Sequence, residues 1–410
     1  MKNFFLLLVI GVLTQFQPIL AAEPFIEKTN LFEAGKEGYK LYRIPGIVVT
    51  KSGAVLAYCE ARKSARGDWG PIDILMRRST DGGKTWLKRQ KIVQLKGDLP
   101  LNPVAVKKNL DKPGDNTVNN PVAFVDYETG AIHFLYCLEY MRCYYMRSDD
   151  DGATWSEPVE ITKTFDAFKN DYDWKVIATG PGHGIQLTLG KNIGRLVVPV
   201  WLSLGTGGHA HRPSVTSTIY SDDHGKTWER GEIAVPNTKD YVNPSETVIV
   251  QLTDGNVMIN SRHETAKHRR LVTVSPDGAA NWSKPMFDES LAEPVCMASI
   301  VRVRHLSTSR PGLIAFANPD NFKSRKRKNV SVKLSTDDAK TWTANRSIEP
   351  GISGYSDLTA LPDGTILCFY ERGSTDPKNH YKTAFLTVAR FNEAWVRASE
   401  TFPPCGGTCP

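Results

Sequence analysis

Ser79-Thr80-Asp81-Gly82-Gly83-Lys84-Thr85-Trp86 is the first of several copies of the pattern S-x-D-x-G-x-T-W in this sequence. An aspartate in a tight turn accepts hydrogen bonds from nearby backbone N–H groups. The glycine permits a positive φ, and the tryptophan buries a large apolar area under the hairpin. We therefore interpret each box as a folding element of a β-hairpin, without a catalytic role. Further copies begin at Ser148, Ser221, Ser335 (with Ala339 in place of the glycine) and, more weakly, Ser275.

Between the boxes, short apolar runs alternate with turn signals such as Asp254-Gly255 and Pro362-Asp363-Gly364. Such runs without helical periodicity predict an all-β protein. Units of about 55–70 residues that each close with a similar hairpin indicate four-stranded propeller blades. Residues 25–395 would hold about six such units, so we expect a six-bladed β-propeller of four-stranded antiparallel blades. The clearest runs are residues 47–49, 132–135, 195–201, 247–251 and 365–370.

The N-terminus has the features of a targeting segment. Lys2 precedes an apolar run over residues 4–13, and Ala21 and Ala22 are small residues at which a signal peptidase could cleave. The run is too short for a permanent membrane span, and no later run reaches about 18 apolar residues. We expect a signal peptide over residues 1–22 and a secreted or periplasmic protein; an uncleaved membrane anchor is the alternative. Residues 23–400 would form one catalytic propeller domain, and residues 401–410 a surface tail.

Composition excludes several other classes of protein. Hydrophobic residues make up 40% and charged residues 23% of the chain, as in ordinary globular proteins. The net charge of +7 suits an anionic partner without establishing one. The basic stretch at residues 323–328 lacks interleaved aromatic residues, so we interpret it as a solvated loop and expect no nucleic-acid partner. No nucleotide-binding motif is present, and a monomer is expected.

Cysteine and histidine usage gives no sign of a metal site. The seven cysteines are an odd number and include no CxxC pair. Cys405 and Cys409 could close a small terminal loop, and we interpret the other five as small buried hydrophobic residues. His209 and His211 have no carboxylate or thiolate partners nearby in the sequence, which favours loop residues over metal ligands.

Further motifs give the chain a family resemblance. Tyr42-Arg43-Ile44-Pro45 lies upstream of the first box, and together with the ordered boxes it resembles the sialidase (neuraminidase) family, in particular the bacterial and animal exo-sialidases. Residues 180–186, 194–199 and 354–358 resemble further conserved stretches of that family. The resemblance covers nearly the whole chain after the targeting segment. It implies a retaining exo-α-sialidase that acts on sialylated glycans and needs no cofactor or metal.

The resemblance also implies how the substrate carboxylate is held. In sialidases three arginines converge on the carboxylate of the sugar, and guanidinium groups bind carboxylates at two points. Matched by motif, these are Arg43, Arg262 in Asn260-Ser261-Arg262, and Arg327. Arg325 lies in the same basic stretch as Arg327 and is the alternative for the third position.

Tyr355 in Gly354-Tyr355-Ser356-Asp357 matches the family's nucleophile, since sialidases are glycosidases with a tyrosine nucleophile. A phenol has a pKa near 10 and needs a base, and Glu246 matches the partner glutamate. Sixteen positions separate Glu246 from Arg262, as expected for adjacent strands of one blade.

Asp68, in a glycine-flanked loop, is the expected acid/base, because a mobile carboxylate near water can protonate a leaving oxygen and then activate water. Asp73 is its local competitor. By the resemblance, Arg62 and Glu60 would help to line or orient the sugar pocket, and Glu371 would brace the first arginine.

Two other functions are compatible with this family. A trans-sialidase would use the same catalytic set and differ in its acceptor. A non-catalytic glycan-binding propeller would retain the fold but has no need of Tyr355, Glu246 and Asp68 together with three arginines.

Overall fold

The computed structural model describes residues 22–95, 97, 99–305 and 311–398. The expected tail at residues 401–410, with Cys405 and Cys409, and all of the expected signal peptide except residue 22 lie outside this part. Most of the regular secondary structure in the described chain is β-strand, so the predicted all-β class is confirmed. Its helices are short: α1 (Pro103–Lys107), α2 (Thr162–Asp166), the 3-10 helix η1 (Ala167–Asn170) and α3 (Glu393–Arg397).

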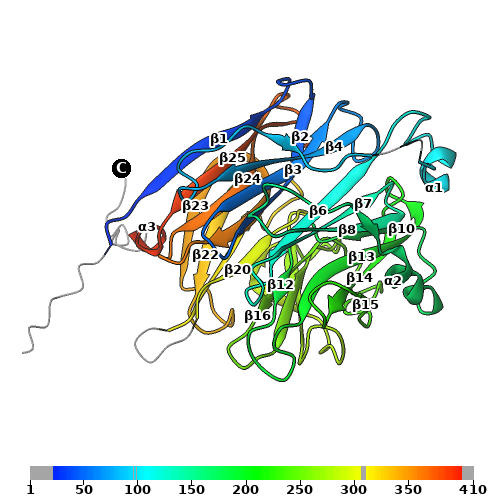
Figure 1. Cartoon of the computed structure of the whole chain (residues 1–410). Helices are drawn as coiled ribbons and strands as arrows, with labels where there is room; N and C mark the ends of the chain where they lie inside the picture. Colours follow the sequence, from blue (N-terminus) through cyan, green and yellow to red (C-terminus); the bar gives the residue numbers. More distant parts are fainter. Residues whose placement is uncertain (1–21, 96, 98, 306–310, 399–410) are drawn as a thin grey trace, which may run out of the picture.

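The strands follow one another around the molecule as neighbouring sheets in a propeller-like arrangement (Figure 1). The first sheet contains β2 (Leu41–Val49), β3 (Val55–Arg62), β4 (Ile72–Ser79) and β5 (Gln90–Lys91). The second contains, in spatial order, β11 (Gly182–His183), β6 (Val118–Val125), β7 (Ile132–Leu138), β8 (Arg142–Ser148) and β9 (Val159–Glu160). In the third, β10 (Val176–Thr179) precedes β13 (Leu196–Gly207), β14 (Arg212–Ser221) and β15 (Glu229–Arg230), and β12 (Ile185–Gln186) also pairs with β13.

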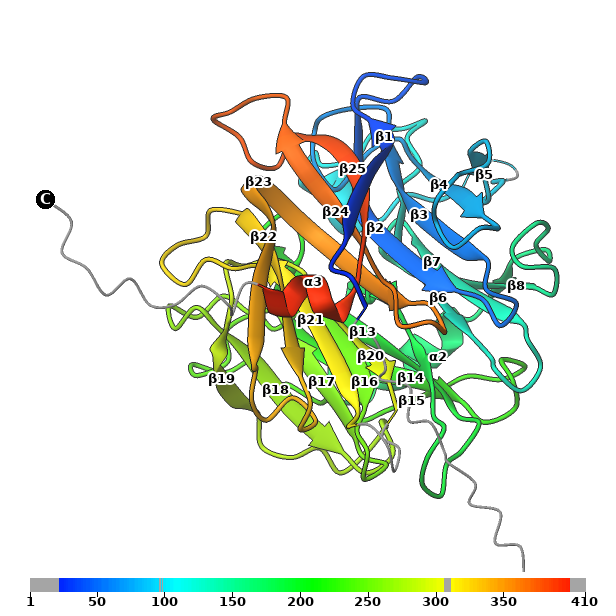
Figure 2. The same ribbon diagram turned by 90° about the vertical axis from the view of Figure 1, so that its left-hand side faces the viewer.

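The remaining two sheets complete the arrangement. The fourth contains β16 (Thr247–Gln251), β17 (Val257–Ser261), β18 (Arg269–Ser275) and β19 (Met286–Ala292). The fifth has the order β1 (Ile26–Glu33), β25 (Thr383–Phe391), β24 (Ile366–Ser374), β23 (Ala344–Ala360), β22 (Lys328–Ser335), β21 (Leu313–Pro319) and β20 (Ser299–Arg304). The first and last strands pair antiparallel within it, so N-terminal and C-terminal segments lie side by side (Figure 2).

The expectation of six separate four-stranded antiparallel blades needs correction. Among the described residues the strands form five sheets, of seven, five, five, four and four strands, and β11 pairs with β6 in parallel. The cause of the largest sheet is β23, whose 17 residues run without interruption. Its first part pairs with β22 and its second part with β24, so two groups of strands are joined.

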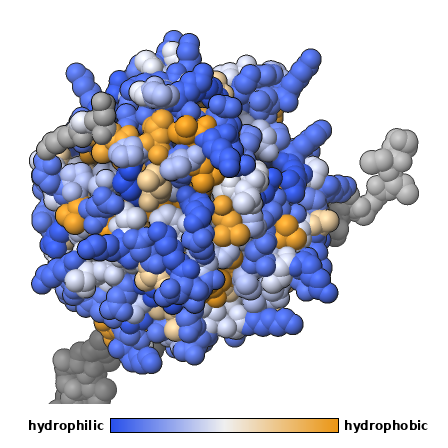
Figure 3. Space-filling model, turned by 90° about the vertical axis from the view of Figure 1, so that its right-hand side faces the viewer, coloured by the Kyte–Doolittle hydropathy of each residue, from blue (hydrophilic) through white to orange (hydrophobic). Residues whose placement is uncertain are grey.

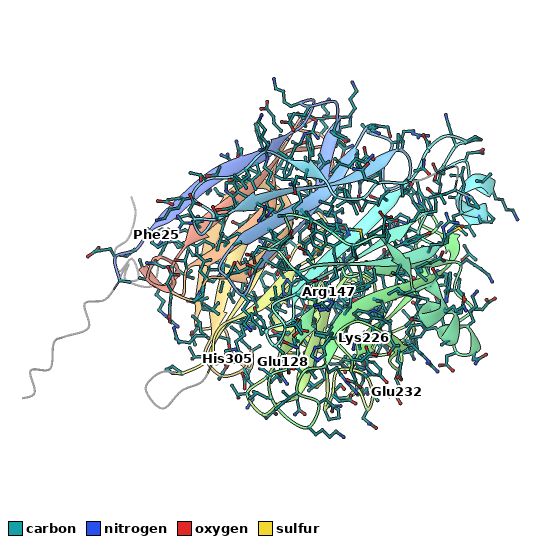
Figure 4. All side chains as sticks on the ribbon, viewed as in Figure 1. Phe25, Glu128, Arg147, Lys226, Glu232 and His305 are labelled. Carbon is teal, nitrogen blue, oxygen red and sulfur yellow. The ribbon has the colours of Figure 1, made fainter. Side chains whose placement is uncertain are left out.

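The core lies between the faces of adjacent sheets. Strands β2, β3, β6 and β7 are buried along their whole length, because each has a neighbouring sheet on both faces. One apolar cluster joins β2 and β3 to β24 and β25, and another joins β3 and β4 to β6 and β7. Side chains fill the space between the sheets (Figure 4). This packing fixes the strand ends that carry the site.

The repeated boxes act as the sequence predicts. In the first box, Asp81 Oδ1 accepts hydrogen bonds from the backbone N–H groups of Lys84 and Thr85, at 3.0 and 2.9 Å. The Trp86 indole donates to the Gly83 carbonyl at 3.2 Å. Asp150, Asp223 and Asp337 make the equivalent contact with the threonine of their own box. These boxes close hairpins and take no part in the cavity described below.

Two further expectations concern the cysteines and the membrane-spanning segments. The five cysteines that the structure describes are buried and unpaired, as predicted for small hydrophobic residues. No helix within residues 22–95, 97, 99–305 and 311–398 has the length and apolar character needed to cross a membrane. The face in Figure 3 is mainly hydrophilic, with small hydrophobic areas between polar side chains.

Candidate active site

A cavity of about 440 Å³ lies where side chains from all five sheets and their loops meet. Seven of the nine predicted site residues line it, and Glu60 and Glu371 lie directly behind, in contact with the lining arginines. The structure therefore brings together side chains that are more than 300 positions apart in the sequence. The seven lining residues are Arg43, Arg62, Asp68, Glu246, Arg262, Arg327 and Tyr355.

Tyr355 and Glu246 form the centre of the site. The Tyr355 hydroxyl donates to Glu246 Oε1 at 2.5 Å and accepts from Arg262 Nη1 at 2.9 Å. Arg262 also pairs with Glu246 Oε2. Backbone hydrogen bonds link Arg262 to Ser245 and Glu246, as expected for the adjacent strands β16 and β17. The phenol thus faces a base that is itself held in place.

The environment keeps the phenol protonated. Burial and, after it, the Glu246 charge raise the pKa of Tyr355 well above its usual value, while the charges of Arg262, Arg327 and Arg43 oppose this shift. A phenol in this state is a weak nucleophile unless its proton is removed as it reacts. Glu246 Oε1, which accepts the hydrogen bond of the phenol, lies where it could receive that proton.

Local backbone features aim Tyr355 into the cavity. The register of β23 against β24 shifts between Ser353 and Ser356, which is the signature of a bulge that reorients a side chain. A Cβ at Gly354 would lie 2.3 Å from Glu371 Oε2, so only glycine fits there. The same Oε2 accepts a hydrogen bond from the Tyr355 backbone N–H at 3.1 Å. Glu371 therefore holds the backbone of β23 at Tyr355.

Three guanidinium groups surround the Tyr355 ring. Arg43 and Arg327 lie over it, with their Cζ atoms 5.1 and 4.7 Å from the ring centroid, and Arg262 contacts its hydroxyl. Glu371 braces Arg43, accepting from Nε at 2.9 Å and from Nη2 at 3.3 Å. The buried Nε atoms of Arg262 and Arg327 have no hydrogen-bond partner among the described residues. The convergence of three guanidinium groups on one ring fits the binding of a carboxylate.

The backbone beside Arg43 contains a register shift like the one at Tyr355. Ile44 has a φ of +58°, which a β-branched residue rarely adopts, and the register of β2 against β3 shifts between Arg43 and Gly46. The Ile44 N–H donates to Glu371 Oε1 at 3.4 Å. The Arg-Ile-Pro motif thus encodes a bulge that presents Arg43 to the cavity.

Asp68 lies at the edge of the cavity on the loop between β3 and β4. Arg62 Nη1 donates to Asp68 Oδ1 at 2.9 Å, and Arg43 Nη1 lies 3.7 Å from the same oxygen. Burial disfavours the carboxylate, but the charges of Arg62 and Arg43 outweigh it and hold the pKa of Asp68 below its usual range. Glu60, fully buried, fixes Arg62 through Nη2 at 2.7 Å.

The structure separates each candidate from its competitor. Asp73, on β4, binds the Tyr39 hydroxyl at 2.8 Å and the amines of Lys91 and Lys63, outside the described cavity lining. Arg327 is 4% exposed and touches Tyr355. Arg325 also lines the cavity, but its side chain is 53% exposed and lies beside Glu264 at the rim.

Several lining residues were not predicted from the sequence. Trp201, on β13, and Ser214, on β14, are buried, and their Nε1 and Oγ atoms have no hydrogen-bond partner in the described chain. His209 and His211 occupy the turn between these strands, so the loop prediction is confirmed, but both also line the cavity. Burial, before any charge effect, lowers the pKa of His211 to about 4. The only sequence signal for this wall was the His-x-His pair.

Comparisons with known proteins agree with this geometry. The model of the BNR repeat-like domain family matches residues 101–368. A sialidase from Micromonospora viridifaciens is 31% identical over 91% of this chain, and one from Bacteroides fragilis is 28% identical over 82%. The chain spans only 55% and 61% of the length of these two relatives.

Solved structures show the same fold. The structure of the Hadza microbial sialidase Hz136 superposes with a TM-score of 0.71 at 27% identity, covering 90% of this chain and 69% of that one. The family model covers more than half of the chain, and the relatives carry the sialidase name. The chain therefore belongs to the sialidase family and contains its BNR repeat-like domain.

Proposed function

We propose that the protein is a retaining exo-α-sialidase, which hydrolyses terminal sialic acids from glycoproteins, glycolipids or oligosaccharides. The observation that carries the proposal is the hydrogen bond between Tyr355 and Glu246 inside a group of three arginines. A sialic acid has a carboxylate on its anomeric carbon, and this group would bind Arg43, Arg262 and Arg327. The sialidase relatives support this substrate class.

In the first step, the Tyr355 oxygen attacks the anomeric carbon while Glu246 takes the phenolic proton. Asp68, entering the step in its protonated form, donates a proton to the glycosidic oxygen, and the bond to the leaving group breaks. A neutral phenol approaches a carbon that carries a carboxylate without the repulsion that a carboxylate nucleophile would meet. The product is a tyrosyl-enzyme intermediate.

In the second step, water attacks the anomeric carbon as Asp68 accepts its proton. The bond to the Tyr355 oxygen breaks, and the phenol recovers its proton from Glu246. Two displacements at one carbon give net retention of configuration. Both carboxylates return to the protonation state in which they entered the cycle.

The ion pairs of Asp68 explain how binding can prepare the acid. In the free protein, the charges of Arg62 and Arg43 keep Asp68 ionised. A bound substrate carboxylate would share Arg43 and reduce the positive charge that Asp68 experiences. The pKa of Asp68 would then rise toward the value that a proton donor needs.

The remaining expectations are also proposals. We propose a protein that is secreted or periplasmic after cleavage near Ala21 and Ala22, and that acts as a monomer without a cofactor or metal. We further propose that the seven-stranded sheet comprises two blades that share β23, which would give six blades in all. The division of β23 between β22 and β24 supports this blade count.

The test of the function is release of 4-methylumbelliferone from its α-sialoside by wild type, Tyr355→Phe and Asp68→Ala. Wild-type turnover that is nearly lost in Tyr355→Phe supports the proposal. NMR of the first sugar anomer released would then report retention, and product analysis would separate free sialic acid from transfer or anhydro products. A folded wild type that binds sialosides without turnover would contradict the proposal and indicate a glycan-binding propeller.

A further inference from the structure

The loop that carries Asp68 has few contacts at the carboxylate itself. The Asp68 side chain is 33% exposed, and a Cβ at the preceding Gly67 would meet no atom within 4 Å. Gly67 and Gly70 both have strongly positive φ values, so this loop backbone depends on glycine. Protonation of Asp68 weakens its contact with Arg62 because the ion pair is lost, although Arg62 Nη1 also donates to the Gly67 carbonyl at 2.8 Å. Contacts that do not depend on the charge of Asp68 therefore matter more for the position of its protonated form.

Trp69, the next residue, provides such a contact. It is 3% exposed and is not among the cavity-lining residues that the structure describes. Its indole Nε1 donates to the carbonyl oxygen of His209 at 2.9 Å, and its ring packs 4.7 Å from the ring of Tyr140 and 5.9 Å from that of His211. The residue beside the acid is thus held by the turn between β13 and β14.

The backbone of that turn has an uncommon conformation. Gly208, His209 and Ala210 all have positive φ, and the His211 N–H donates to the Gly208 carbonyl at 3.2 Å. Ala210 is fully buried, and its carbonyl accepts from the Ser203 hydroxyl at 3.2 Å. The His209 carbonyl is therefore presented to Trp69 by a conformation that the neighbouring contacts fix.

A second anchor holds the other side of the loop. The Thr117 hydroxyl donates to the Gly70 carbonyl at 3.0 Å and accepts from the Gly70 N–H at 2.9 Å. Thr117 is fully buried at the end of the segment that carries α1. Trp69 and Gly70 are thus tied to two different sheets.

We propose that Trp69 is a positioning residue, which sets the location of Asp68 through its hydrogen bond to the turn at His209. This inference rests on the proposed function. In this role Trp69 does not contact the substrate. A change at Trp69 affects only the proton transfer by Asp68. General acid catalysis is needed most when the leaving group is a sugar alcohol and least when it is an acidic phenol.

The experiment compares kcat/KM for 3'-sialyllactose and for 4-nitrophenyl α-sialoside in Trp69→Phe. The phenylalanine keeps the apolar packing and removes the N–H donor. We expect a loss of about 10-fold or more for sialyllactose, because small displacements of a catalytic group are costly, and about threefold or less for the aryl sialoside. The ratio of the two values is the readout, since a merely structural defect would lower both equally.

Trp174→Phe is the matched control. Trp174 is also buried, and its indole donates to the Phe165 carbonyl at 2.7 Å, away from the described cavity lining. This variant should keep the wild-type ratio. Thr117→Val removes the second anchor without touching Trp69 and should change the ratio in the same direction as Trp69→Phe. If Trp69→Phe does not fold, Thr117→Val decides the question.

The outcomes separate this inference from the function on which it rests. A wild type that hydrolyses neither substrate contradicts the proposed function. A wild type that hydrolyses both, with the same ratio in Trp69→Phe as in Trp174→Phe, leaves the function standing and overturns the positioning role. An unchanged ratio in Thr117→Val, when that variant has to decide, overturns it equally.

Discussion

The hydroxyl of Tyr355, on β23, donates a 2.5 Å hydrogen bond to Oε1 of Glu246, which precedes β16, so strands 109 positions apart hold a phenol and its base together. We expect Glu246→Gln to reduce kcat/KM for an aryl sialoside about 100-fold or more, because an amide cannot accept the phenolic proton. Steady-state kinetics on the folded variant measures this. Activity within about threefold of wild type would contradict the role of Glu246 as the base.

Arg327 and Arg325 provide a matched pair for the third arginine. Arg327→Ala removes a buried guanidinium that lies over the Tyr355 ring. The loss of a charge-assisted contact to the substrate carboxylate should lower kcat/KM about 10- to 100-fold, mainly through KM. Arg325→Ala, at an exposed site beside Glu264, should change it less than about threefold. The reverse order of effects would assign the substrate carboxylate to Arg325.

The copies of the box predicted the all-β fold, because their turn chemistry is local and repeats along the chain. The sequence did not predict the seven-stranded sheet. Pro350-Gly351 has the composition of a turn, yet β23 passes through it, because its two halves pair with different neighbours. A pairing set by tertiary contacts cannot be predicted from local residue types.

In the site, too, some features follow from local sequence and others depend on tertiary packing. Arg43 and Tyr355 stand in motifs that also encode their bulges, so the motif identified both the residue and its presentation. Trp201 and Ser214 belong to ordinary strand sequences, and only the packing of β13 and β14 places these two residues in the cavity lining. Their positions depend on sheet geometry, which the alternation of residues along a strand does not give.

In the box that begins at Ser335, Ala339 replaces the glycine of the first three copies, and it has a φ of +61°. This conformation costs alanine about 1–2 kcal/mol relative to glycine, which is partly offset by the greater freedom of glycine in the unfolded chain. We expect Ala339→Gly to raise the free energy of unfolding by about 0.5–1 kcal/mol. Denaturant unfolding measures this.

The converse change is Gly83→Ala in the first box, where a Cβ would lie 2.7 Å from Leu367 Cδ2 at a φ of +82°. It should destabilise the protein by about 1–3 kcal/mol without altering kcat/KM for an aryl sialoside. Loss of stability in Ala339→Gly, or a change in activity of the folded Gly83→Ala protein, would show that the boxes are more than folding elements.

Glu139, close to the loop that carries Asp68, is expected to make the stability of the protein depend on pH. It is fully buried, and its Oε1 accepts from the backbone N–H of Thr117, the residue that anchors Gly70, at 2.6 Å. Burial, followed by a hydrogen bond to Asp111, raises the pKa of Glu139 to about 8. The pKa of Glu139 in the folded protein lies above its pKa in the unfolded chain, so between these two pH values the folded state binds more protons. The protonated Glu139 therefore stabilises the folded protein at low pH, and this stabilisation is lost as the pH rises toward 8.

Glu139→Gln keeps an acceptor for Thr117 and a donor for Asp111 but cannot ionise. The thermal midpoint of Glu139→Gln relative to that of wild type should therefore increase steadily between pH 5 and 8, because the wild type loses stability over this range. Each unit of pKa shift corresponds to about 1.4 kcal/mol. Parallel melting curves at several pH values measure the difference. Asp81→Asn, which alters an exposed box aspartate, is the control and should show no such trend over this range, because the pKa of Asp81 lies below its usual value. A constant difference between Glu139→Gln and wild type would mean that Glu139 is already ionised in the folded protein at pH 5.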